Sequence, residues 1–182
     1  MNGEECLEQA YHYILTGDFE AAEEWFRRAV EAEPDEPSYW YRASITLARS
    51  GKLEQALSYA MRSVELAPDE SAYVLHLRTL EARKLSAGAK ELLEQAPPDS
   101  DAAVLLLKEA VRLDPLSGEA KLLLGVAYRY SGQYRIAIET FKELIHLQPN
   151  NEEAKRILRE TRTERRLLLK QTYSLNKDKK DW

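Results

Sequence analysis

The residue types that most often carry out catalysis or bind metals are few and widely spaced in this chain. His12, His76 and His146 are separated by 64 and 70 residues. None of them stands with a carboxylate and a nucleophile in an arrangement that a sequence could assign to catalysis. Cys6, the single cysteine, has no cysteine or histidine partner at the spacing of a zinc site. We therefore expect no nucleophilic active site and no metal site.

Other patterns that could bind a cofactor or nucleic acid are also weak. Residues 86–90, Ser-Ala-Gly-Ala-Lys, lack the spacing of a phosphate-binding P-loop. The acidic pairs are interpreted as charge at helix N-termini or facing solvent; they are Glu4-Glu5, Glu23-Glu24 and Glu152-Glu153. Five aromatic residues fit a hydrophobic core better than a base-stacking platform: Trp25, Phe26, Trp40, Tyr41 and Phe141. We expect a protein that is not an enzyme, needs no cofactor and has no small-molecule substrate.

Composition narrows the class of protein further. A chain of 182 residues suits one domain or one short solenoid, and 44% hydrophobic with 31% charged residues fits a soluble, helix-rich chain. No apolar run reaches the roughly 18 residues that span a membrane. The acidic N-terminus lacks the basic region of a secretory signal. Together with the lone cysteine, which fits a reducing compartment, these features predict a cytoplasmic protein without membrane insertion.

Pairs of amphipathic helices joined by a tight turn recur along the chain, and residues 121–150 show the pattern most clearly. Small residues there would allow two helices to approach closely, and aromatic residues would fill the space beside the contact. The turn is at Ser131-Gly132 and the unit ends at Pro149. The positions that define the unit are Leu124, Gly125, Tyr128, Ala137 and Phe141.

Prolines mark further copies of this unit. Pro34, Pro68, Pro115 and Pro149 are separated by 34, 47 and 34 residues, so the third unit carries 13 extra residues. The matching positions are Tyr13, Gly17, Ala22, Phe26 and Ala29 before Pro34; Trp40, Ala43, Ser44, Leu47, Gly51, Ala56 and Ala60 before Pro68; and Ala103, Leu107 and Ala110 before Pro115.

This set of positions closely resembles the tetratricopeptide repeat, a 34-residue helix–turn–helix unit. The departures are Gln9 and Ala10 in place of a large/small pair, Ser63 in place of alanine, and the irregular third unit. The resemblance implies an all-α fold, a right-handed superhelical solenoid over residues 1–150. Its four repeats would lie at about 3–34, 37–68, 70–115 and 117–150. A capping helix at 151–175 and a flexible tail at 176–182 would follow.

The extra residues of the third unit leave two interpretations of residues 84–98. The first helix of that unit, expected at 72–84 with Asp69 as N-cap, either extends to about Gln95 or breaks near residues 86–88 before a short separate helix. We favour the break, because an extension would displace the return helix by several turns and uncover apolar surface. Asp99 or Ser100 is expected to cap the helix that ends at Leu113, and Asn150 the last helix.

The resemblance also implies a function. In this family the first helices of the repeats line a concave groove that binds an extended or helical segment of another protein. The corresponding positions in this chain are Leu7, Tyr11, Tyr41, Arg42, Ile45, Arg49, Leu75, His76, Thr79, Arg83, Leu122, Val126, Arg129 and Tyr130. Tyrosine and arginine often carry binding energy, so a partner segment with acidic and apolar residues is expected. The alternative is that the arginines pair with neighbouring glutamates and that several other positions pack between repeats.

The sequence also bears on four other functions. The lysine and asparagine of the clamp that binds chaperone tails are missing, because the corresponding residues are Leu7, Tyr11, Arg42, Ala72 and His76. Residues 176–182 resemble the linker before a J domain in some co-chaperones. Residues 151–182 carry 10 basic and 6 acidic residues, but the net charge of −9 over residues 1–150 disfavours nucleic acid. Self-association through the groove and a second copy's last helix remains an alternative.

Overall fold

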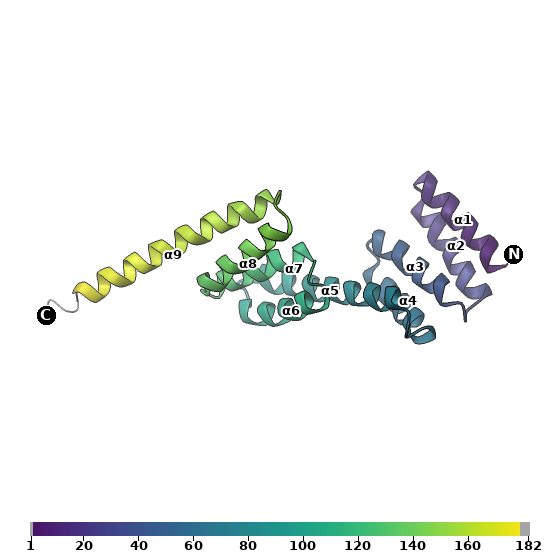
Figure 1. The fold of residues 1–182 in the computed structure, drawn as a ribbon, viewed down its shortest axis with the longest axis horizontal. Coiled ribbons are helices and arrows are strands. Elements are labelled where there is room, and N and C mark those ends of the chain that lie inside the picture. Colours follow the sequence, from purple (N-terminus) through teal and green to yellow (C-terminus); the bar gives the residue numbers. More distant parts are fainter. Residues whose placement is uncertain (1, 179–182) are drawn as a thin grey trace. The chain divides into compact units, whose positions relative to one another are not determined.

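The computed structural model describes residues 2–178, with side chains up to residue 173. Over these residues the protein consists of nine α-helices and contains no strand (Figure 1). They are α1 (Gly3–Thr16), α2 (Phe19–Ala32), α3 (Pro37–Arg49), α4 (Leu53–Leu66), α5 (Ser71–Glu94), α6 (Ser100–Leu113), α7 (Gly118–Tyr130), α8 (Tyr134–Leu147) and α9 (Glu152–Asp178). The all-α prediction of successive helical hairpins followed by a last helix is confirmed.

Glycine and proline set the limits of the hairpins. Gly17, Gly51 and Gly132 follow the first helices α1, α3 and α7 and have φ angles of 81°, 78° and 74°. This left-handed conformation is strained for residues with a Cβ atom, so glycine permits the tight turn into the second helix. Each second helix ends two residues before a proline, which cannot continue it.

The chain forms two compact units, Met1–Lys84 and Leu85–Trp182, which are described separately. In the first unit α1 packs on α2, α3 on α4, and α2 against α3. Alanines at the helix crossings are completely buried, which allows large side chains beside them to fill the core. The core residues include Ala10, Phe26, Ala43, Leu47, Ala56, Leu57, Ala60 and Leu80.

In the second unit α6 packs on α7, α7 on α8, and α8 on α9. Phe141 is completely buried and its ring lies against Gly125, where a larger residue would not fit. The remaining core around it includes Ala137, Ile138, Ile157 and Leu158. Gly125 therefore lets α7 approach the Phe141 ring of α8 closely, and Ala137 is buried in the same core.

The favoured break at residues 86–88 was wrong, because α5 runs without interruption from Ser71 to Glu94. Ala89 on its second half is completely buried with Ala103 and Leu107 of α6, and Leu92 and Leu93 pack against the same cluster. Burial of this apolar stripe outweighs the roughly 1 kcal/mol that Gly88 costs a helix relative to alanine.

We favoured a break because an extended first helix would displace the second helix of the third unit. This displacement does occur. The extra residues move α6 along α5, so that α6 packs against the second half of this helix. Leu77 and Leu80 on the first half are covered by Leu47, Ala56 and Leu57 of α3 and α4. Leu75 is left 63% exposed. The insertion is thus helical and supplies a first helix for α6.

Helix caps differ from the predictions at two of three places. Asp99 accepts a hydrogen bond from the amide of Ala102, as predicted. The amide of Ala72 donates to the side chain of Glu70, so Asp69 does not cap α5. The side chain of Asn151, one residue after the expected Asn150, accepts from the amide of Ala154 and caps α9.

The last helix, α9, has two halves with different surroundings. In the first half Ala154, Ile157, Leu158 and Thr161 are buried against the preceding hairpin. In the second half the side chains from Arg165 to Tyr173 are exposed. The helix continues to Asp178, and residues 179–182, most of the J-domain-like linker, lie outside the described residues. None of the helices within residues 2–178 is both long and apolar enough to span a membrane.

Two glycines within helices test the packing of the second unit. Alanine at Gly125 would place its Cβ within 2.8 Å of Phe141 Cδ1, whereas at Gly88 the nearest neighbour would be Leu106 Cδ1 at 3.7 Å. Gly125→Ala should lower the free energy of unfolding by about 1–3 kcal/mol through overpacking. Gly88→Ala should raise it by up to about 1 kcal/mol through helix propensity. Chemical denaturation measures both, and equal effects of the two changes would contradict the packing described.

Candidate functional site

Aromatic and basic side chains from the first helices of the first unit contact one another. The ring of Tyr41 lies 4.6 Å from that of Tyr73 and meets His76 edge-on at 5.3 Å, measured between centroids. Arg42 Nη1 donates a hydrogen bond of 2.5 Å to the hydroxyl of Tyr11, and its guanidinium lies 5.7 Å from that ring's centroid. We call Tyr11, Tyr41, Arg42, Tyr73 and His76 the aromatic–arginine cluster.

His76 is fixed by a hydrogen bond to the core. Ser44 Oγ donates to the carbonyl oxygen of Ala56 at 2.7 Å, so it can accept a hydrogen bond from His76 Nε2 at 2.9 Å. This assigns the proton of the neutral ring to Nε2. Burial lowers the pKa of His76, and the positive charge of Arg83 lowers it further. The imidazole is therefore held in its neutral form.

The cluster lies at a partly exposed surface. Tyr11 is 39% exposed, Arg42 is exposed, and Tyr41, Tyr73 and His76 are half-buried. Arg49 and Arg83 are also exposed. Among the described side chains, no carboxylate forms an ion pair with Arg42, Arg49 or Arg83. This surface therefore combines arginine charge that is not neutralised by a direct ion pair with tyrosine rings.

The other predicted groove residues of the first unit differ in how far they are exposed. Leu7 packs against the core around Cys6 and Val30. Ile45 and Thr79 are half-buried, and Leu75 is exposed. The structure thus pairs Tyr11 with Arg42 and Tyr41 with His76. Tyr73 was missed, although its position three residues before His76 places both on one face of a helix.

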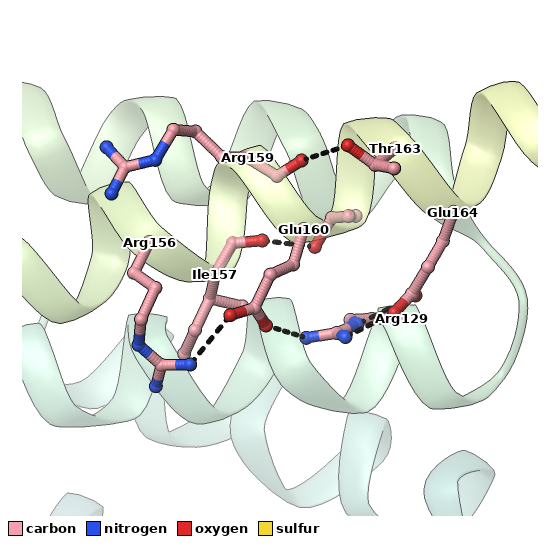
Figure 2. A network of polar contacts seen from close by, with 8 residues as sticks. Arg129, Arg156, Ile157, Arg159, Glu160, Thr163 and Glu164 are labelled. Carbon is pink, nitrogen blue, oxygen red and sulfur yellow. Dashed lines mark hydrogen bonds and ion pairs between the residues drawn. The ribbon is translucent and has the colours of Figure 1, made fainter.

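In the second unit α9 covers most of the predicted groove positions. Leu122 and Val126 pack against the core that Ile157 and Leu158 of α9 complete. Arg129 lies between two glutamates of α9: its Nε donates to Glu164 at 2.9 Å and its Nη1 to Glu160 at 3.3 Å (Figure 2). Only Tyr130, at 59%, is largely exposed.

The ion pairs around Arg129 belong to a network that fastens α9. The Glu164 hydrogen bond raises the pKa of Arg129, although partial burial opposes this. Hydrogen bonds from Arg156, at 2.7 Å, and from Arg129 lower the pKa of Glu160. Arg129 therefore pairs with glutamates of the adjacent helix, which is the alternative to a ligand-binding role for this residue.

The residues considered for metal binding or catalysis are not gathered into one place. Within the described part of the chain, no three histidine, cysteine or acidic side chains lie close enough to hold a metal ion. Cys6 is buried, whereas His12 and His146 are exposed. His76 contacts tyrosines and a serine.

The Arg129–Glu164 pair should show measurable coupling. The side chain of Arg129 is only 21% exposed and makes two hydrogen bonds to Glu164. A double-mutant cycle with Arg129→Ala and Glu164→Ala should give a coupling free energy of about 1 kcal/mol that decreases with added salt. The exposed pair Arg112–Glu109 is the control and should couple more weakly. Equal coupling in the two pairs would contradict a fastening role.

The lowered pKa of His76 predicts a pH effect. Because the folded protein favours the neutral ring, this residue's contribution to stability is complete above pH 6.5 and is lost as the pH falls below that value. The unfolding free energy of the wild type relative to His76→Gln should therefore decline between pH 7.5 and about 5. Denaturation at each pH measures this difference, and NMR titration of the imidazole gives its pKa. A difference that is constant over this range would refute the prediction.

Comparison with known proteins identifies the fold family. A sequence profile described as tetratricopeptide repeat matches residues 7–71 and 98–152. A search of curated protein sequences found no match. Among solved structures, MamA 41-end from Desulfovibrio magneticus RS-1 has a TM-score of 0.56 at 18% identity, covering 90% of this chain and 85% of that chain. MamA AMB-1 has a TM-score of 0.55 at 19% identity, covering 89% and 81%.

These identities are low, so the two structures show a shared fold and nothing more. The two regions matched by the family profile, by contrast, span more than half of the sequence. Their hairpins coincide with α1–α4 and with α6–α8 of the structure. The chain belongs to the tetratricopeptide repeat family.

Proposed function

We propose that this protein is an interaction module whose first unit binds a segment of another protein. The family consists of protein-interaction modules of this helical-repeat kind. The observation that carries the proposal is the aromatic–arginine cluster, which is partly exposed and held in place by its own contacts. Such preorganisation reduces the side-chain entropy lost on binding.

The chemistry of the cluster favours a segment that alternates acidic and apolar residues. Arg42, Arg49 and Arg83 can each donate hydrogen bonds to a carboxylate, with charge that no described side chain neutralises directly. The rings of Tyr11, Tyr41 and Tyr73 offer apolar surface with a hydroxyl at the edge. An extended or helical peptide with both kinds of side chain matches this surface.

The second unit contributes differently. Arg129 is engaged by α9, and Leu122 and Val126 are covered by it. We therefore restrict the proposed groove to the first-unit residues Tyr11, Tyr41, Arg42, Arg49, Tyr73, Leu75, His76 and Arg83. Affinity should be about micromolar, or about −8 kcal/mol, because ordering a flexible peptide offsets part of the contact energy.

A peptide titration tests the proposal. Fluorescence anisotropy with a labelled peptide of about 12 residues, alternating glutamate with leucine or phenylalanine, should show binding that weakens with salt. Arg49→Ala/Arg83→Ala should reduce the affinity by about tenfold and flatten the salt dependence. The control, Arg27→Ala/Arg62→Ala, makes the same charge change on α2 and α4, where both arginines pair with glutamates of their own helix.

The outcomes separate the groove from other surfaces. Circular dichroism must first show that both double variants keep the helical fold. Light scattering on the free protein separates a monomer from the self-associated alternative. If Arg49→Ala/Arg83→Ala retains both affinity and salt dependence, the first-unit groove is not the binding surface.

A further inference from the structure

A second surface lies where α9 extends beyond the hairpin that it covers. Helices α7 and α8 have 13 and 14 residues, whereas α9 has 27. Figure 1 shows the second half of α9 continuing past the end of α8. The buried stripe of the first half reaches Thr161, and seven residues later Leu168 is 47% exposed. An apolar stripe that is buried in the first half thus continues without cover.

Charge changes at the same point of the helix. In the first half, glutamates form ion pairs with arginines. Glu160 pairs with Arg156, and both Glu160 and Glu164 pair with Arg129 (Figure 2). From Arg165 to Tyr173 the sequence contains three basic residues and no acidic one. Among the described side chains, Arg165, Arg166 and Lys170 form no ion pair. Their charge is available to a partner.

A surface cavity of about 510 Å³, wide open to solvent, lies along this part of α9 beside Ile138 of α8. Its apolar lining comes from Ile138, Leu169 and Tyr173, and its positive charge comes from Arg162, Arg165, Arg166 and Lys170. A second cavity of about 340 Å³ shares Arg165 and Leu169 and is also lined by Ile136. We call Ile138, Arg165, Arg166, Leu169, Lys170 and Tyr173 the basic cradle.

We propose that the basic cradle binds an acidic amphipathic segment of another protein, one that places apolar side chains against Ile138 and Leu169 and carboxylates against the surrounding cations. This site is separate from the groove of the first unit and does not depend on it. Arginine and tyrosine around a small apolar centre are the residues that tend to dominate interface energetics. Because the surface is positively charged, charge complementarity requires a negatively charged partner segment.

The arrangement of the side chains disfavours other occupants. A lipid surface requires the apolar residues on one face, but Leu167, Leu168 and Leu169 are consecutive and point about 100° apart around the helix. Pairing with α9 of a second copy would oppose like charges. A nucleic acid would satisfy the arginines but not the aliphatic lining formed by Ile138 and Leu169.

The experiment compares three labelled probes by fluorescence anisotropy: a helical Glu/Leu peptide, a Glu/Ser peptide of equal charge, and a single-stranded oligonucleotide. All titrations use the full chain carrying Arg49→Ala/Arg83→Ala, so that the proposed groove of the first unit contributes little. The Glu/Leu peptide should bind about tenfold more tightly than the Glu/Ser peptide and the oligonucleotide.

Variants locate the binding. Arg165→Glu/Arg166→Glu should reduce affinity for the Glu/Leu peptide by at least about tenfold. Leu169→Ser should reduce binding of the Glu/Leu peptide but not of the Glu/Ser peptide. The control, Lys108→Glu/Lys142→Glu, makes the same charge change at exposed sites on α6 and α8 outside the cradle and should leave affinity unchanged.

Some results would overturn the proposal. Because Arg165, Arg166 and Leu169 are exposed, their replacement should leave the melting temperature nearly unchanged, and this is checked first. Equal binding by the α9 variants and the control would place the peptide elsewhere. Tighter binding of the oligonucleotide than of the Glu/Leu peptide would make the cradle a nucleic-acid site. Concentration-dependent light scattering that Arg165→Glu/Arg166→Glu abolishes would make it a self-association surface.

Discussion

A helical hairpin cannot bury its apolar face by itself, and the rest of this structure depends on that constraint. Each hairpin needs the next helix along the chain to cover it. In the first unit α3 covers α2, and in the second unit α7 and α9 cover α6 and α8. Close approach of the helices requires small residues at the crossings, which is why Ala10, Ala56, Gly125 and Ala137 are buried.

The same constraint explains the long helix α5. Its first half places Leu77 and Leu80 in the core of the first unit, and its second half places Ala89 in the core with α6. The single helix α5 therefore contributes buried residues to two hydrophobic cores, one in each unit. Of the 13 extra residues, 11 lengthen α5, which has 24 residues against 13 in α3 and in α7, and two lengthen the connection between α5 and α6.

Covering the last hairpin also decides where binding surface remains. Arg129 is hydrogen-bonded to α9, and Leu122 and Val126 pack against the core that α9 completes. The second unit therefore has few predicted groove residues that remain accessible to a partner. From Arg165 to Tyr173 the side chains of α9 are exposed. The two proposed binding surfaces, the aromatic–arginine cluster and the basic cradle, are thus parts of the repeat architecture that neighbouring helices leave partly exposed.

The sequence by itself determined the fold class, most helix limits and the hairpin turns, because these depend on local spacing: small residues at fixed offsets, glycine at positive φ and proline after each second helix. The sequence also predicted that Tyr11, Tyr41, Arg42 and His76 are positions of the groove. Only the tertiary structure decided whether Gly88 interrupts α5, because the cost of glycine is local whereas the burial of Ala89 depends on α6. Likewise the role of Arg129 depends on Glu160 and Glu164, 31 and 35 residues away. Such pairings follow from which helix covers which, and the spacing of residues along a single helix does not contain that information.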